Sequence, residues 1–452
     1  MNKLSMKFKT LNLLATLCAS TLAYGNPIPT INGGKPNPTG IIDLPGAVSA
    51  QTPIGGIGDH PWQNPNVDAL RIRMGWVDIE TADGVFNWVQ LDECIANAAT
   101  VRKFIGLSLV SGLAATPWLM GGVTFADGST TVNSATLTSP TANFVTADVG
   151  RVIVCSNFPP GTTIRSRTTS TSVVLSASAN KTKTGNVTFS ILARNPGGAQ
   201  FRNLTPPSMG VMPVPWDPIF KAQWKAFIVA LAARYDHSPQ LGYLSMTGFC
   251  QGGEAYLAGV QADIDFFNAS AIAAGYNGTP ELPAGLVAWE AVVKEMVDQY
   301  MISFPNTPLF ITAARPYPDL LTPSLQGGTT AMNDIFAWGV ANYPGRFGIM
   351  NAQLHVTSTL GYFLNAAIYA NHLTEPVGIQ FLCNSGPDNI ARLCNAPPYG
   401  DGPLLRPYNA MNASFTAGVS FGCNFIEVYE YDVTNPAYQT MLAIQRAALQ
   451  RN

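Results

Sequence analysis

The sequence predicts an α/β fold, namely a (β/α)8 TIM barrel with an inserted small all-β module. Apolar segments of strand-like composition alternate with segments of helical periodicity, which is the order of a parallel sheet. Eight such strands can be assigned from residue 47 onward, the number that a closed β/α barrel needs. The alternation stops between residues 122 and 195, where Ser and Thr are frequent and Glu is absent.

Length and composition agree with one large domain that carries an appendage. The chain has 452 residues, of which 47% are hydrophobic, so it can bury a sizeable core. Charged residues make up only 12%, about half the usual share, which suits a protein outside the cytosol. The formal net charge of −2 offers no basic surface for nucleic acid, so we expect no nucleic-acid partner. The sequence does not define an oligomeric state.

Residues 1–25 have the features of a secretory signal peptide. Lys3 and Lys7 precede a mainly apolar stretch, Leu11–Leu22, which is too short to cross a bilayer. Small residues at Ala23 and Gly25 then provide a cleavage site. We therefore expect a secreted or periplasmic protein without membrane insertion.

The first part of the barrel is assigned to residues 47–121. Residues 26–46 are rich in Pro, Gly and Asn without any period, so they are predicted to be a leader or linker. The elements that follow are predicted in the order strand, strand, helix and strand, at Ala47–Ile54, Leu70–Trp76, Leu91–Val101 and Lys103–Val110.

The inserted module is assigned to residues 122–195. Its turn signals include Asp127-Gly128 and Pro159-Pro160-Gly161, and apolar residues alternate with Ser and Thr between them. Two roles remain open for such a module. It is either a stack of hairpins that decorates a barrel loop or a unit that contributes to binding.

Residues 196–452 are assigned to the remainder of the barrel with the loops of its catalytic face. Five further strands are predicted at Leu241–Thr247, Leu309–Ala313, Phe347–His355, Val377–Cys383 and Phe425–Tyr431. Helices are predicted between and after them, at Phe220–Arg234, Val287–Ser303, Met332–Asn342, Tyr362–Asn371, Met411–Phe421 and Pro436–Leu449.

Cysteine usage gives no sign of a metal site. The chain lacks a CxxC pair and any Cys/His cluster at zinc spacing, so neither a metal nor a cofactor is expected. Cys383 and Cys394 flank a loop rich in Gly, Pro and Asn, and they are the pair that we expect to form a disulfide in an oxidising compartment.

The residues at the C-terminal ends of the predicted strands suggest carbohydrate chemistry, because a TIM barrel builds its active site there. Glu254 follows the fourth strand, His355 ends the sixth, Gln380 lies in the seventh and Glu427 in the eighth. Asp78 and Glu80 follow the second strand, Asp319 follows the fifth, and Glu430 and Asp432 lie in the eighth with Glu427. Trp76, Trp118 and Trp216 lie in the loops of the same face. Carboxylates cleave glycosidic bonds and indole rings stack on sugars. The alternative for the tryptophans is simple loop packing.

Rival chemistries lack their motifs. The sequence contains no GxSxG element of an esterase, no P-loop or GxGxxG after a strand, and no HExxH.

The chain resembles the clan of (β/α)8 retaining glycoside hydrolases that contains the family 5 cellulases and mannanases and the family 42 β-galactosidases. Arg71–Trp76, together with Glu80 and Phe86-Asn87-Trp88, is similar to an early motif of that clan. Thr116-Pro117-Trp118-Leu119 is similar to its Pro-Trp-Leu motif, and Val214–Pro218 is similar to the segment before its acid/base strand.

The resemblance implies roles for two residues. Glu254 corresponds to the acid/base at the end of the fourth strand, and Arg71 to the arginine that steadies the nucleophile. The seventh strand departs from the clan, because Gln380 stands where the nucleophile is expected and a neutral amide cannot form a glycosyl ester. The residue before Glu254 also departs, since Gly253 replaces the usual Asn.

Three possibilities follow for the second acid. Glu427 is the first candidate, as nucleophile or general base, although it could instead be a buried acid paired with Arg71 or Arg73. A loop acid such as Asp388 is the second. The third is a degenerate site that only binds glycan. Glu254 has its own alternative, a rim carboxylate hydrogen-bonded to loop amides.

The sequence therefore predicts a secreted glycoside hydrolase that acts on a poly- or oligosaccharide through paired carboxylates, Glu254 and Glu427. Arg71, Trp76, Trp118, Trp216, His355 and Gln380 are the expected substrate-binding residues. The alternative is a non-catalytic glycan-binding or surface protein on a degenerate glycosidase barrel.

Overall fold

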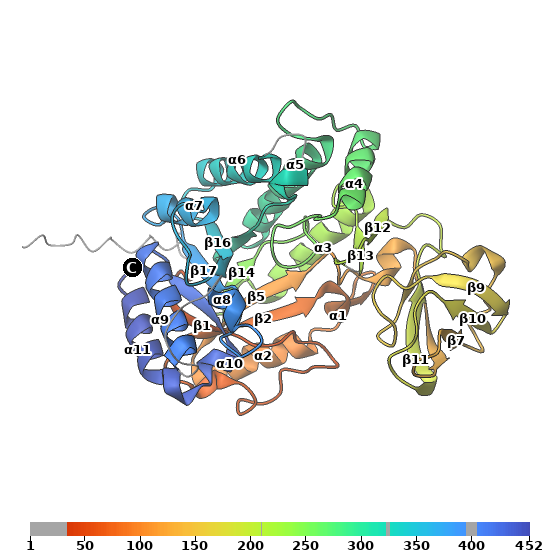
Figure 1. The fold of residues 1–452 in the computed structure, drawn as a ribbon, viewed down its shortest axis with the longest axis horizontal. Helices are drawn as coiled ribbons and strands as arrows, with labels where there is room; N and C mark the ends of the chain where they lie inside the picture. Colours follow the sequence, from red (N-terminus) through yellow and green to blue (C-terminus); the bar gives the residue numbers. More distant parts are fainter. Residues whose placement is uncertain (1–33, 209, 322–325, 395–404) are drawn as a thin grey trace, which may run out of the picture.

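The computed structural model describes residues 34–208, 210–321, 326–394 and 405–452, so the predicted signal peptide lies outside it. Eight parallel strands close a barrel in the order β1-β18-β17-β16-β15-β14-β5-β2, surrounded by helices (Figure 1). The predicted (β/α)8 barrel is thereby confirmed. Its strands are β1 Gly40–Leu44, β2 Ala69–Gly75, β5 Phe104–Val110, β14 Leu241–Ser245, β15 Leu309–Ala313, β16 Phe347–Leu354, β17 Val377–Phe381 and β18 Phe425–Tyr429.

The first strand was predicted in the wrong place. It is Gly40–Leu44, inside the segment expected to be a leader, whereas Ala47–Ile54 contributes only an isolated bridge from Ala47 to Arg73. All five residues of β1 are buried, and the strand pairs in parallel with β18 along its whole length. Because β18 comes from the far end of the chain, the pairing that makes β1 a strand leaves no local pattern.

The helices of the outer layer fall close to their predicted positions. The helix α3, Pro218–Tyr235, begins where the Asp217 side chain accepts hydrogen bonds from two backbone amides. One long helix, α4, was not predicted. The helices are α1 Trp76–Ile79, α2 Val89–Val101, α3, α4 Gln261–Ala273, α5 Ala284–Ser303, α6 Gly327–Asn342, α7 Phe363–Asn371, α8 Ile390–Cys394, α9 Leu405–Ser420, α10 Glu430–Val433 and α11 Gln439–Leu449. In the part of the chain that the structure describes, none of them is long and apolar enough to cross a membrane.

The inserted segment forms a separate antiparallel sheet of six strands in the order β8-β11-β6-β7-β10-β9, on the right of Figure 1. It has its own apolar cluster, which includes Phe144, Phe158 and Phe189. The sheet follows β5 and leads into the hairpin β12–β13, so it grows from a loop at the C-terminal end of a barrel strand. Its strands are β6 Val123–Thr130, β7 Thr136–Thr138, β8 Ile153–Val154, β9 Ile164–Thr169, β10 Ser172–Leu175 and β11 Lys183–Ile191, and the short pairs are β3 Glu80–Ala82, β4 Val85–Phe86, β12 Phe201–Leu204 and β13 Gly210–Pro213.

Aromatic rings fill the lower part of the barrel. Phe310 and Phe425 meet edge to face with ring centroids 5.2 Å apart, and both contact the ring of Tyr243. Gly106 of β5 makes room for that ring, because a Cβ at this position would lie 2.0 Å from it. The packed layer supports the polar residues that lie above it in the barrel.

The expected disulfide is not formed. Cys383 and Cys394 are both buried free thiols, as are most of the other described cysteines. They therefore act as small apolar residues of the core, which is the usual role of a buried free cysteine.

Candidate functional site

A cavity of about 470 Å³ opens at the C-terminal end of the barrel. Its lining residues follow or end neighbouring strands: Leu113 comes after β5, Gln251–Glu254 after β14, Arg315 after β15, and Gln353 lies near the end of β16. Tyr256 and Tyr362 add two aromatic side chains to its wall. This is the position at which a TIM barrel places its active site, and the volume is that of a small-molecule pocket.

The loop that carries Glu254 is fixed to the barrel through its backbone. The amide of Ala255 donates to the carbonyl of Thr312 at the end of β15, and the carbonyl of Gln251 accepts from the amide of Leu113. Gly253 is required here because a Cβ would lie 2.7 Å from the hydroxyl of Ser108. The Asn that the clan places before its acid would not fit against this wall without a rearrangement.

Glu254 is a half-buried carboxyl on the wall of the cavity. Desolvation by burial raises its pKa, and the positive charges of Arg71, Arg392 and Arg73 oppose this rise. Within the described residues its carboxyl group takes part in no hydrogen bond or ion pair. The interpretation of Glu254 as a rim carboxylate held by loop amides is therefore wrong, and the group is left available to a ligand.

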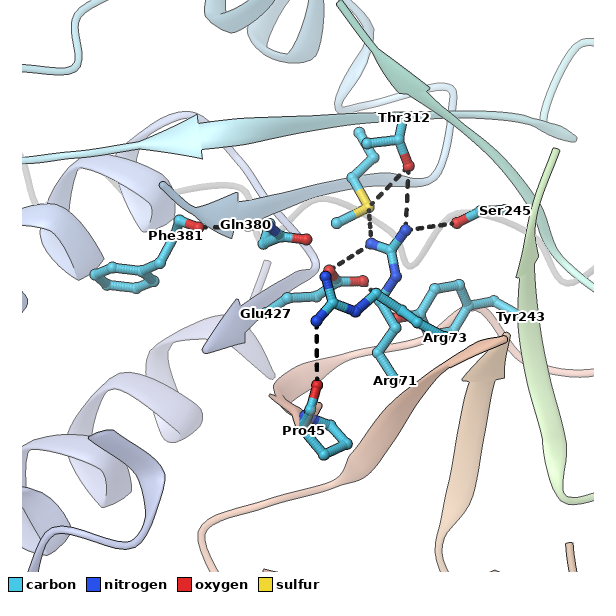
Figure 2. A network of polar contacts seen from close by, with 10 residues as sticks. Pro45, Arg71, Arg73, Tyr243, Ser245, Thr312, Gln380, Phe381 and Glu427 are labelled. Carbon is cyan, nitrogen blue, oxygen red and sulfur yellow. Dashed lines mark hydrogen bonds and ion pairs between the residues drawn. The ribbon is translucent and has the colours of Figure 1, made fainter. Parts of the chain in front are cut away.

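Glu427 lies inside the barrel, in a closed polar network (Figure 2). One carboxylate oxygen is 2.5 Å from Nη1 of Arg71, and the other accepts the hydroxyl of Tyr243, also at 2.5 Å. Ser245 accepts a further bond from Nη2 of Arg71 at 3.1 Å. The exposed fraction of Glu427 is 0% and that of Arg71 is 2%. Burial raises the pKa of Glu427, while Arg71 and Tyr243 favour its charged form.

This placement corrects the predicted pair of carboxylates. Glu254 lines an open cavity. Glu427 is fully buried inside the barrel, and its two carboxylate oxygens are bound by Arg71 and Tyr243. The alternative prediction, a buried acid paired with Arg71, describes the observed geometry. Arg71 is likewise enclosed, so it cannot touch a substrate as expected. Asp388, the loop acid, is fully exposed on the segment after β17.

Gln380 and Arg73 lie beside the network in the barrel (Figure 2). Gln380 pairs in register with Glu427 on the neighbouring strand, and its exposed fraction is 9%. Its amide makes one long contact, 3.5 Å to the carbonyl of Phe381. Arg73 donates one long bond, 3.4 Å to the carbonyl of Pro45, and its buried Nε has no hydrogen-bond partner among the described residues.

Two of the three tryptophans expected to stack on sugars are buried by their neighbours instead. Trp76 has an exposed fraction of 0%, donates to Glu80 at 2.7 Å and packs among other aromatic rings. Trp216 is buried and donates to Ser270 at 3.1 Å. Trp118 is half-buried against Trp76. The prediction of sugar contact is wrong for Trp76 and Trp216, because aromatic rings of α3 cover Trp76 and the ring of Phe267 in α4 packs on Trp216.

The remaining polar candidates have structural partners. His355 is half-buried, its Nδ1 lies 3.0 Å from the hydroxyl of Thr357, and burial lowers its pKa. Four acids hold nearby backbone or side-chain donors: Asp78 accepts from Gly75, Glu80 from Trp76, Asp432 from Ser385, and Glu430 pairs with His60. Asp319 pairs with Arg315 at 2.8 Å.

Five polar residues of the cavity were not predicted from the sequence: Gln251, Tyr256, Arg315, Gln353 and Tyr362. Arg315 comes two residues after the end of β15, and Gln353 is the penultimate residue of β16. The rule that strand ends carry the site would have found both. Tyr362 begins a helix, and only the tertiary structure brings its ring to the cavity wall.

No protein-family model matches the chain, and no curated protein matches it by sequence. Solved structures that align with it include the catalytic domain of the major endoglucanase from Xanthomonas campestris pv. campestris, with 10% identity, a TM-score of 0.45, and coverage of 94% of this chain and 99% of that one. A β-galactosidase from Bacillus circulans sp. alkalophilus aligns with 11% identity and a TM-score of 0.41, over 87% of this chain and 50% of its own.

A pyruvate kinase from Pyrobaculum aerophilum also aligns, with 9% identity and a TM-score of 0.33, over 91% of this chain and 72% of that one. No activity follows from similarities at this level. The barrel is established by its own strand pairing, and it is the fold that the resemblance in sequence implies.

Proposed function

We propose that this protein is a secreted glycoside hydrolase that acts on a poly- or oligosaccharide in the cavity, with Glu254 as its general acid. The observation that carries the proposal is the state of Glu254. It is a carboxyl on the wall of an open cavity at the C-terminal end of the barrel, free of hydrogen bonds within the described residues, with a raised pKa.

A general acid needs these properties. It must keep its proton near the working pH and reach the glycosidic oxygen, and a carboxyl that loop amides already hold in its charged form does neither well. Once the proton has left, the charges of Arg71, Arg73 and Arg392 stabilise the carboxylate. Tyr256 and Tyr362 offer rings on which a sugar can stack, and the side-chain amide of Gln353 can donate to its hydroxyls.

Glu427 is not part of this proposal. Glu254 protonates the leaving oxygen as the glycosidic bond breaks, water adds to the anomeric carbon, and the proton that this water loses returns to the Glu254 carboxylate. Glu427 takes no part, because both of its oxygens are bound within the barrel. The N-terminal segment supports export, since residues 1–25 have the organisation of a signal peptide.

The second candidate function is glycan binding without turnover. Two observations favour it. Gln380 occupies the position of the clan's nucleophile, and Glu427, which pairs with Gln380 on the neighbouring strand, is fully buried and has no access to the cavity. Such a protein would use the same cavity to hold a saccharide. The two candidates therefore differ in turnover and not in the location of the site.

The test is a polysaccharide panel with product detection by reducing-end release, applied to the parent protein, Glu254→Gln and Glu281→Gln. Glu281 is an exposed glutamate before α5 and serves as the matched control. We expect Glu254→Gln to lose activity by about 10²- to 10⁴-fold while Glu281→Gln retains it. Equal activity of all three would overturn the role of Glu254. Saccharide binding by the parent without any release of reducing ends would establish the second candidate.

A pH profile adds a second readout. A general acid must be protonated, and the pKa of Glu254 is raised, so kcat/KM of the parent should fall only as the pH rises above that raised pKa. Glu254→Gln should lose this alkaline limb. An unchanged limb in the variant would mean that another group donates the proton.

A further inference from the structure

The cavity that holds Glu254 also contains a cation whose orientation is fixed in advance. Nε of Arg315 lies 2.8 Å from Asp319 and donates to the hydroxyl of Thr329, also at 2.8 Å. The guanidinium carbon lies 5.6 Å from the ring centroid of Tyr362 and 4.9 Å from that of Phe363. Contacts at one edge and over the aromatic rings hold the group without using its outer edge.

The outer edge of Arg315 is available. A guanidinium has five N–H donors, and the contacts to Asp319 and Thr329 involve only the one on Nε. Within residues 34–208, 210–321, 326–394 and 405–452, neither Nη atom of Arg315 makes a hydrogen bond. The side chain is 37% exposed and lines the cavity. This is a fork whose geometry suits a carboxylate or a sulfate ester.

The charges around Glu254 point the same way. Two of the arginines near it are matched by acids, Arg71 by Glu427 and Arg315 by Asp319. Arg73 and Arg392 have no acidic partner among the described residues, and both act on Glu254. Two unmatched cations thus face one carboxyl, which carries no charge while it holds its proton. The arginines that act on Glu254 therefore outnumber the acids that pair with them.

We propose that the cavity takes a sugar that bears an anionic group, either a uronate carboxylate or a sulfate ester, and that Arg315 binds this group. The inference rests on the proposed carbohydrate site and adds the class of substrate. A neutral sugar would leave the N–H groups of Arg315 and the surplus charge unused, whereas an anion satisfies both.

Binding to matched oligosaccharides tests this, with the full-length chain in the Glu254→Gln background so that no ligand is consumed. The probes are trigalacturonate, its methyl ester, cellotriose and a sulfated galactan trisaccharide, measured by isothermal titration calorimetry. We expect at least one of the two anionic probes to bind about tenfold or more tightly than both neutral ones, as for a charge-assisted contact. The comparison of trigalacturonate with the sulfated trisaccharide identifies the anion.

Variants assign the preference to its residue. Arg315→Gln should remove the advantage of the anionic probe and leave the affinity for cellotriose unchanged, and Arg315→Lys should restore part of it. Arg234→Gln is the matched control, because Arg234 is a surface arginine paired with Asp92 at the end of α3. It should change nothing.

Three results would overturn the inference, and they are distinguishable. If neutral and anionic probes bind equally well, the carbohydrate site stands and the role of Arg315 falls. If none of the four probes binds, then neither the preference for an anion nor, for these sugars, the carbohydrate site itself is supported. If Arg315→Gln still binds the anionic probes more tightly than the neutral ones, the inference would also be contradicted, because another group would then bind the anion.

Discussion

The ion pair inside the barrel gives a prediction that separates a structural Glu427 from a catalytic one. Glu427→Leu removes the acceptor of two groups that are themselves buried, the guanidinium of Arg71 and the hydroxyl of Tyr243. Breaking a buried ion pair costs about 3–5 kcal/mol. The hydroxyl left without an acceptor adds about 1–2 kcal/mol. Arg71→Met should cost about 3–5 kcal/mol, because it leaves Glu427 uncompensated.

The double variant Arg71→Met/Glu427→Leu should be much less destabilised than the sum of the two single variants. Replacement of both charges by apolar groups of similar volume is often neutral or stabilising, so we expect a coupling free energy of at least about 3 kcal/mol. Urea unfolding followed by tryptophan fluorescence measures it. All eight tryptophans lie outside residues 122–195, so the signal reports the barrel and not the inserted sheet.

Additive effects of the two substitutions would refute the reasoning, because independent sites add. So would a Glu427→Gln variant that keeps its stability and loses turnover in the polysaccharide assay. That result would mean that Glu427 reaches the substrate and that the network opens during the reaction.

Three further predictions follow from local geometry. Gly106→Ala places a Cβ 2.0 Å from the ring of Tyr243 and should destabilise the barrel by about 1–3 kcal/mol in urea unfolding, and an unchanged midpoint would contradict the packing described here. Burial raises the pKa of Glu375 to about 7, so the folded state holds this proton more tightly. Its contribution to stability is complete below about pH 4.5 and lost as the pH rises to 7. Glu375→Gln should flatten that decline in unfolding midpoints measured across this range, and an equally steep decline would exclude Glu375 as its source. Asp217→Ala removes the N-cap of α3 and should lower the free energy of unfolding by about 1 kcal/mol, measured by thermal unfolding. Asp217→Ser should keep most of the parent's stability, because a serine hydroxyl can also cap the helix.

The order of strands and helices was predictable because it depends on local periodicity. Seven of the eight barrel strands lie where apolar alternation placed them, and the inserted sheet lies where the composition changed. The exception, Gly40–Leu44, is short and follows a segment rich in Pro and Gly. Its strand character comes from pairing with β2 and with β18, the second of which lies across most of the length of the chain.

The candidate site was predictable only in part. Glu254 could be placed from its position after a strand, and the same rule would have reached Arg315. The tryptophans were assigned to the wrong surroundings, because a loop position does not reveal which face of a ring is covered. Trp76 is enclosed by residues of α3, a helix that begins well over a hundred positions later in the sequence.

The sequence by itself determined the barrel, the insertion point of the β sheet and the strand end that carries Glu254. Each of these depends on local amino-acid composition and on the spacing of apolar residues. Only the tertiary structure decided which acids share a space. The alternation along β18 points Glu427 into the barrel, but burial there depends on Arg71 and Tyr243 arriving from two other strands. An open carboxyl and a sealed one look alike in the sequence, because access to solvent is a property of the packed neighbours.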